Sequence, residues 1–231
     1  QFLCTIPPLP LAVRSVRVSI FDGFKGLSRD EPEVASNIGI QLEHMALTTW
    51  SISVRRRLRD AMSHLKPKNV IQTGAGIGHL SAWFFNHFEQ EGGLSNFQMI
   101  EEGNRFAVIL TRLKERYSSV PASIVVGTPS LLSSELKAWN ISKIGEPPML
   151  PNADAIIVDS IMTRLADDVK SMLPLLNKNG VLFTVEPTPP VGDREEDDPE
   201  VVGFNKWMEL LQSTNATHQL AFAPLFGGTI V

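Results

Sequence analysis

Short apolar runs that fit buried strands alternate along the chain with longer segments whose apolar residues recur at helical spacing. The predicted parallel strands are one that ends at Val70-Ile71, then Asn96–Ile100, Ser123–Val126, Ala153–Val158 and Val181–Val185. A helical segment follows each of them, and His218–Ala223 with Gly228–Val231 is predicted to close the chain as an antiparallel pair. This alternation predicts an α/β fold with a doubly wound, mostly parallel seven-stranded sheet that ends in a C-terminal antiparallel hairpin.

The N-terminal part of the chain has a different pattern. Residues 1–37 are predicted to form an N-terminal arm, and residues 38–231 a single domain. Residues 30–33 combine a proline with acids, which is typical of the first turn of a helix. The helical pattern over residues 38–65 predicts two helices or one bent helix, which Pro67 ends.

A turn rich in glycine follows the first strand. Gly74, Gly76 and Gly78 have no Cβ, so the backbone here can adopt positive φ and approach a ligand closely. Free N–H groups at the start of the next helix, over Leu80–His87, favour the polar end of a nucleotide-like cofactor. The G-x-G-x-G spacing differs from the dinucleotide fingerprint, and the missing G-K-[ST] excludes a P-loop. The alternative is that the glycines serve only helix–strand packing.

Ligands of such sheets bind beyond the carboxyl ends of the strands. The polar segments at these ends are Gln72–Gly78, Glu101 with Glu102, Thr128–Ser130, Asp159 with Ser160, and Glu186. Because parallel strands share one edge, we expect these segments to lie around one site.

Composition and charge indicate which partners and which cellular compartment are expected. The chain has 231 residues with 43% hydrophobic and 20% charged residues, enough for one α/β domain of ordinary globular composition. A formal net charge of −4 provides no basic field for nucleic acid or a membrane, so neither partner is expected. The one cysteine excludes an internal disulfide, which favours a reducing compartment, the cytoplasm.

In this order, the strand ends resemble those of the class I S-adenosylmethionine (SAM) methyltransferases. The turn Leu176-Asn-Lys-Asn-Gly-Val-Leu182 and the ending Ala223-Pro-Leu-Phe-Gly-Gly-Thr-Ile-Val231, with Phe204-Asn205 opening a late helix, resemble the catechol/caffeoyl-CoA type O-methyltransferases. The resemblance extends from about residue 40 to the last residue. It implies a Rossmann-like methyltransferase fold, SAM as cofactor and a small-molecule methyl acceptor, and it admits a homodimer.

The resemblance also implies roles for individual residues. The residues it assigns to the cofactor are Gly74, Ala75, Gly76, Gly78, Glu101, Glu102, Pro129, Ser130, Asp159 and Ser160. The glycine loop would take the methionine part, and Glu101, directly after the second strand, would accept both ribose hydroxyls. The residues after Gly127 would line the adenine. Asp159 matches a metal-binding aspartate near the methyl-transfer point and is the expected catalytic residue.

Three departures from the family pattern affect the chemistry. Gln72 replaces the usual acid of the glycine motif, Glu186-Pro187 replaces Asp-Asn, and Met162 occupies the position of the catalytic lysine. Since proline has no side-chain oxygen for a metal, no metal site is expected. The candidates for the general base are then Asp159, Glu186, His79 and His44.

Two other functions fit parts of the sequence. Asp154-Ala-Ile-Ile-Val-Asp-Ser160 also resembles the fourth strand of aminopropyltransferases of the spermidine synthase type. The lost metal ligand and lysine favour a non-catalytic SAM-binding protein. O-methylation of a small molecule remains the leading hypothesis.

Overall fold

A computed structural model describes residues 27–231 of the chain. Its helices and strands are α1 (Glu33–His44), α2 (Ile52–Leu65), β1 (Asn69–Thr73), α3 (His79–Glu91), β2 (Asn96–Glu101), α4 (Asn104–Arg116), β3 (Ala122–Val126), α5 (Pro129–Ser142), β4 (Ala153–Val158), α6 (Met162–Met172), a short 3-10 helix (Leu173–Leu175), β5 (Leu176–Phe183), α7 (Pro199–Thr214), β6 (Ala223–Leu225) and β7 (Gly228–Ile230). Most of the predicted arm lies outside the described residues, and residues 33–37 belong to α1. The predicted helix start at residues 30–33 is confirmed. Of the two alternatives left open for residues 38–65, the structure has two separate helices.

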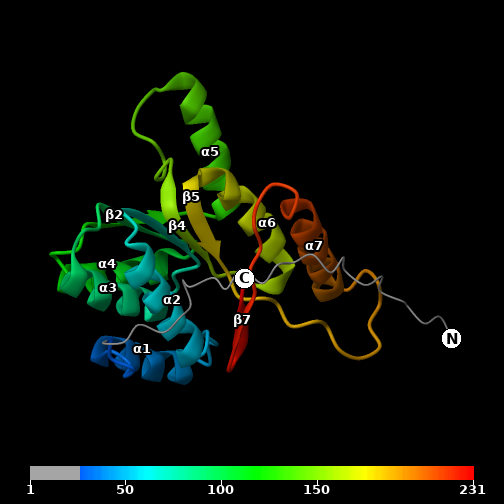
Figure 1. Cartoon of the computed structure of the whole chain (residues 1–231), viewed down its shortest axis with the longest axis horizontal. Helices are drawn as coiled ribbons and strands as arrows, with labels where there is room; N and C mark the ends of the chain where they lie inside the picture. Colours follow the sequence, from blue (N-terminus) through cyan, green and yellow to red (C-terminus); the bar gives the residue numbers. More distant parts are fainter. Residues whose placement is uncertain (1–26) are drawn as a thin grey trace.

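A five-stranded parallel sheet in the order β3-β2-β1-β4-β5 forms the centre of the fold. Figure 1 shows α5, α6 and α7 on one side of this sheet and α1 to α4 on the other. Alternate residues of β1 contribute to two separate cores, Val70 to the core under α1–α4 and Ile71 to the core under α5–α7. Helices therefore cover both faces, as the near-continuous apolar strands require.

Register brings the predicted site segments together. Thr73, the last residue of β1, pairs with Ile100 of β2 and with Val158 of β4. The residues that follow these three strand positions therefore meet at one edge. The direction in which the chain adds strands also reverses beside β1, which is where ligands of doubly wound sheets bind.

The predicted seven-stranded sheet is wrong, because the main sheet has five strands and β6 with β7 forms a separate antiparallel pair. An isolated bridge between Val185 and Ile230 joins the two sheets. Hydrogen bonds link Thr184 to Val231 in both directions, at 3.0 and 2.9 Å, and Glu186 N–H to Thr229 O at 2.8 Å. β7 thus meets the chain beyond the end of β5 instead of along its length. Pro187 then ends the pairing because it has no N–H to donate.

Two local predictions near the C-terminus are also corrected. The predicted strand over residues 218–223 is wrong except for its last residue, because the observed strand is β6, and the preceding helix α7 is three residues longer at its C-terminus than predicted. The predicted turn at residues 177–180 lies within β5, where the register with β4 shifts and Asn179 adopts a φ of 69°. The residues that the sequence pattern assigned to a turn form a bulge within the strand. No described helix is long and apolar enough to cross a membrane.

Candidate active site

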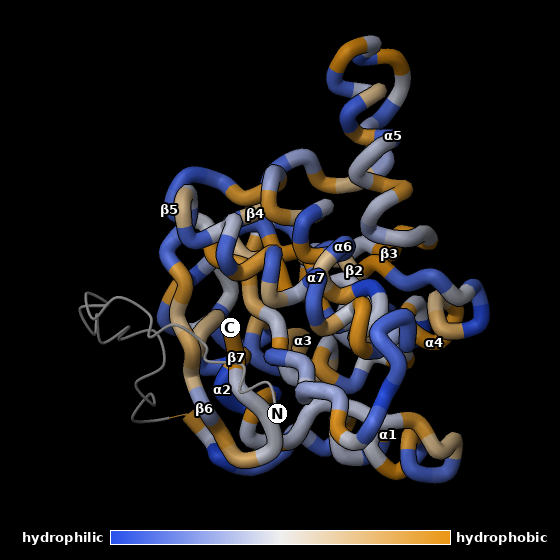
Figure 2. The backbone as a smooth tube through the Cα atoms, turned by 90° about the vertical axis from the view of Figure 1, so that its right-hand side faces the viewer, coloured by the Kyte–Doolittle hydropathy of each residue, from blue (hydrophilic) through white to orange (hydrophobic). Residues whose placement is uncertain are grey.

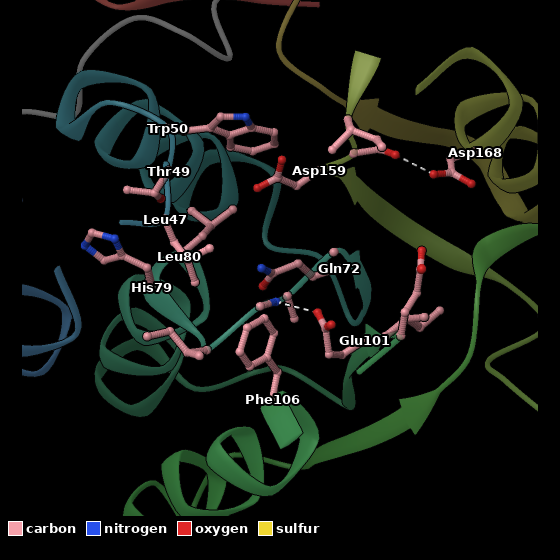
Figure 3. A pocket seen from close by; sticks show the side chains of 18 of the residues that line it. Leu47, Thr49, Trp50, Gln72, His79, Leu80, Glu101, Phe106, Asp159 and Asp168 are labelled. Carbon is pink, nitrogen blue, oxygen red and sulfur yellow. Dashed lines mark hydrogen bonds between the residues drawn. The ribbon is translucent and has the colours of Figure 1, made fainter. Parts of the chain in front are cut away.

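A cleft of about 560 Å³ opens at the carboxyl edge of the sheet. Its floor is the glycine loop between β1 and α3, and its walls come from the ends of β2 and β4, the start of α6 and the segment between α1 and α2 (Figure 3). A cleft of this size lies within the usual range of small-molecule sites.

Glycine is required at the three positions of the loop for different structural reasons. A Cβ on Gly74 would lie 2.0 Å from the Asp159 carbonyl oxygen, and one on Gly78 would lie 2.5 Å from Leu113 Cδ2 of α4. A Cβ on Gly76 would meet no atom within 4 Å. All three have positive φ: 65° at Gly74, 55° at Gly76 and 91° at Gly78. Gly74 and Gly78 therefore allow close packing within the fold, whereas Gly76 leaves space at the cleft.

Glu101 is a buried carboxylate held by backbone donors. Gly76 N–H donates to its Oε2 at 2.7 Å and Gly103 N–H donates to its Oε1 at 3.0 Å, so each oxygen has one partner (Figure 3 draws the first bond). Gly103 caps the N-terminus of α4, where the helix dipole favours a negative charge. Two carboxylate oxygens can together accept about four hydrogen bonds, so acceptor capacity remains for a ligand. Glu102 is exposed and instead pairs with Arg164 at 2.8 Å.

Asp159 faces the cleft from the end of β4. Burial, followed by the negative charge of Glu101, raises the pKa of the Asp159 carboxyl to about 7. Within residues 27–231, no hydrogen-bond donor compensates this carboxylate, and its main-chain N–H donates to Thr73 O at 3.2 Å. The side chain is therefore a base whose protonation changes near neutral pH.

A second acid was missed by the sequence reasoning. Asp168, buried on α6, accepts a hydrogen bond of 2.5 Å from Ser160 Oγ (Figure 3). Burial raises the pKa of Asp168, although the Ser160 hydrogen bond and the nearby Arg164 oppose this shift. Only its helical spacing after Ser160 could have indicated it, and an acid on an amphipathic helix is ordinarily a solvated one.

His79 lines the cleft but is turned toward α1. Its Nε2 lies 3.1 Å from Glu31 Oε1, and its buried Nδ1 has no hydrogen-bond partner among the described residues. Burial lowers the pKa of His79, and the positive charge of Arg55 lowers it further, against the opposing effect of Glu31. His79 is consequently neutral at pH 7, and Glu31 holds it.

The structure brings most of the predicted site residues into the cleft. Those that line it are Gly74, Ala75, Gly76, Glu101, Glu102, Pro129, Asp159 and Ser160. Gly78 instead packs under α4, and the exposed Ser130 bonds to Thr128 at 3.3 Å. Of the base candidates, Asp159 and His79 line the cleft, whereas Glu186 and His44 do not.

The segment between α1 and α2 was not predicted to contribute. Leu47, Thr48, Thr49 and Trp50 line the cleft from this segment. Nothing in its residues marks it, since neither a motif nor a strand end lies there. Proximity arises because α1 and α2 pack against α3, which begins at the glycine loop.

The described residues contain no group of three or more His, Cys, Asp and Glu side chains placed to hold a metal ion. Metal-independent activity stays a prediction.

No model of a known protein family matches the chain, and no curated protein matches it. Solved structures do. The O-methyltransferase TomG of Streptomyces achromogenes, in complex with SAM, has a TM-score of 0.63 and 15% identity over 87% of this chain and 89% of its own. The Podospora anserina methyltransferase PaMTH1, bound to S-adenosylhomocysteine (SAH), has a TM-score of 0.58 and 14% identity over 96% of both chains. A putative caffeoyl-CoA O-methyltransferase of Staphylococcus aureus has a TM-score of 0.62 and 13% identity over 86% of this chain and 91% of its own.

Identities this low show a shared fold. The chain therefore has the Rossmann-like fold of the class I SAM-dependent methyltransferases, and this prediction from the sequence is confirmed.

Proposed function

We propose that this protein is a SAM-dependent methyltransferase that methylates a hydroxyl oxygen of a small molecule. The observation that carries the proposal is the convergence of the open glycine loop, Glu101 and Asp159 on one cleft at the switch point of the sheet. The names of the structural neighbours support the same reaction class.

The residues of the cleft fit the cofactor. Gly76 leaves space where any side chain would intrude, and Glu101 retains lone pairs suited to two ribose hydroxyls. Gly127 and Pro129 would contact the adenine. The acidic lining suits a ligand with a positively charged sulfonium. When bound, SAM supplies an electrophilic methyl group on that sulfonium.

Asp159 is the proposed general base. A carboxylate with a pKa of about 7 is half ionised at neutral pH, which makes it a stronger base than an ordinary aspartate. It would take the proton of the acceptor hydroxyl as the oxygen forms its bond to the methyl carbon and the carbon–sulfur bond breaks, its electrons remaining on sulfur. The remaining work is positioning of donor and acceptor.

The test combines two measurements on the full chain. Calorimetry with SAH and with NAD should show binding of SAH only. Transfer of a labelled methyl group from SAM should then be measured on panels of phenols, catechols and carboxylates. Binding of NAD without SAH would contradict the cofactor, whereas SAH binding without transfer to any panel would favour a non-catalytic SAM-binding protein. Transfer from decarboxylated SAM to putrescine would instead indicate an aminopropyltransferase.

We further propose that residues 38–231 form the catalytic domain and that the protein acts without nucleic acid or membrane partners. A homodimer remains a prediction that light scattering of the purified chain can test.

A further inference from the structure

Two side chains face each other across the part of the cleft that lies away from Glu101. Trp50 extends from the segment between α1 and α2, and Asp159 extends from β4 toward it (Figure 3). Leu47 and Leu80 add apolar surface beside the indole. The proposed base therefore lies opposite an aromatic side chain that has leucines beside it.

The position of Trp50 is fixed by hydrogen bonds of its neighbours. The Arg55 guanidinium donates to the Trp50 carbonyl. Ser51, the N-cap of α2, accepts from Val54 N–H at 3.3 Å and donates to Phe226 O at 2.8 Å. The indole is thus attached to a short segment that is anchored at the helix start immediately after it.

Arg55 is itself held in place. Glu31 Oε1 accepts from Arg55 at 2.9 Å and from Trp83 Nε1 at 3.3 Å, and it lies 3.1 Å from His79 Nε2. This network joins the start of α1 to α2 and α3. Trp50 is consequently a pre-organised surface and not a loosely placed side chain.

The charges of the cleft are unbalanced. Its acidic residues are Glu101, Glu102, Asp159 and Asp168, and its basic residues are His79 and Arg164. His79 is neutral at pH 7, because burial and Arg55 lower its pKa. Arg164 is committed to Glu102 through both carboxylate oxygens, at 2.8 and 2.9 Å. Among residues 27–231, no lysine lines the cleft. Among the described residues, a carboxylate or phosphate on the acceptor would therefore meet negative charge without a free cation.

We propose, on the basis of the proposed methyl transfer, that the acceptor is an aromatic hydroxyl compound without negative charge, and that Trp50 determines this specificity by stacking on its ring. Stacking places one face of the acceptor on the indole and leaves its hydroxyl toward Asp159. Coenzyme A thioesters, whose phosphates need basic partners, are excluded as acceptors.

Three probes with the same ring test the charge. Methyl caffeate is neutral, caffeate carries a carboxylate, and caffeoyl-CoA carries phosphates. Their binding to the full chain saturated with SAH is measured by calorimetry, which requires no turnover. We expect methyl caffeate to bind at least about tenfold more tightly than either anion, because an uncompensated charge pair near the cleft is worth at least about 1.4 kcal/mol. Equal or tighter binding of an anion, or no binding of methyl caffeate, overturns the proposal.

Matched tryptophan variants test the residue. Trp50→Ala should weaken the binding of methyl caffeate about tenfold. Trp50→Phe should weaken this binding about threefold at most, since an aromatic face is kept. Trp139→Phe is the control, because Trp139 lies on α5 and bonds to Gly145 O at 2.9 Å. SAH affinity should be unchanged in all three variants, which shows that they are folded. Unchanged affinity of Trp50→Ala for methyl caffeate contradicts the role of the indole.

A charge gain completes the test. Thr49→Lys places a cation at the cleft, so the affinity for caffeate should rise at least about fivefold relative to the affinity for methyl caffeate. Thr217→Lys, on a distant exposed segment, should leave the ratio of the two affinities unchanged. Failure of SAH to bind contradicts the proposed function itself. Probe binding that depends on Trp50 without any methyl transfer contradicts the proposed enzyme activity but retains the acceptor site.

Discussion

The Glu101 half and the Asp159 half of the cleft place these two of its four carboxylates in opposite surroundings. Glu101, the last residue of β2, accepts hydrogen bonds from Gly76 N–H of the glycine loop and from Gly103 N–H at the start of α4. Asp159, after β4, is half-buried without such donors, and its partial burial with the charge of Glu101 raises its pKa to about 7. The comparison shows that the surroundings of a carboxylate determine the chemistry that it can perform. A carboxylate with backbone donors is a fixed acceptor for ligand hydroxyls, whereas an uncompensated one exchanges protons near neutral pH.

The largest expected effect is a difference in stability between alanine variants of two glycines, Gly74 beside Asp159 and Gly76 beside Glu101. Gly74→Ala should lower the free energy of unfolding by on the order of 4 kcal/mol or more, because its Cβ would overlap the Asp159 carbonyl at 2.0 Å. Gly76→Ala should cost only about 1–2 kcal/mol of backbone strain, since its Cβ meets no atom. Urea unfolding of both variants measures this difference. Similar losses in both would show that the β4 half of the loop is not packed as described.

The next effect concerns the sign of the pH dependence. Because the Asp159 pKa is higher in the folded than in the unfolded chain, the folded chain binds more protons between about pH 4 and pH 7, and stability falls as pH rises through this window. Asp159→Asn should abolish this loss of stability. At pH 8 the free energy of unfolding of the variant should therefore exceed that of the parent chain by up to about 4 kcal/mol, at about 1.4 kcal/mol per pKa unit. Urea midpoints at pH 5 and pH 8 measure it. The exposed Glu102→Gln is the control and should keep the parental pH profile, whereas parallel profiles of Asp159→Asn and the parent chain would refute the assignment.

A smaller effect tests the Glu101 half. Glu101→Ala should weaken SAH binding by about 1.5–3 kcal/mol, the range for a hydrogen bond to a charged group. Glu102→Ala should change it by less than about 0.5 kcal/mol, because Glu102 is exposed and pairs with Arg164. Calorimetric titration compares the two variants. Equal losses would place the ribose-binding acid one residue further along the chain.

The smallest expected effect is that of metal removal. Asp159 lies in the cleft, but Glu186 does not line it, and Pro187 offers no side-chain oxygen, so two ligands of the family pattern are missing. Methyl transfer should therefore change by less than about twofold in EDTA. A large loss that magnesium restores, and that Asp159→Ala removes, would establish a metal site in the Asp159 half and invalidate its description as a free base.

The sequence alone predicted the parts of the site that depend on local rules. Short apolar runs between helical patterns located the parallel strands, and the glycine spacing with the acids at the ends of β2 and β4 identified Gly74, Gly76, Glu101 and Asp159. These positions follow from the chain itself, because the carboxyl end of a parallel strand always lies at the same edge of the sheet. The resemblance to methyltransferases added the cofactor, and the fold agrees with it.

Tertiary structure decided what depends on distant segments. Packing of α1 and α2 on α3 brings Trp50 opposite Asp159, although the two residues are far apart in the chain and no motif marks Trp50. Burial, which the sequence does not show, raises the Asp159 pKa. The same holds for β7, which pairs beyond the end of β5 because the hydrogen-bonding register of distant strands is set by packing and by Pro187, not by the alternation of apolar residues.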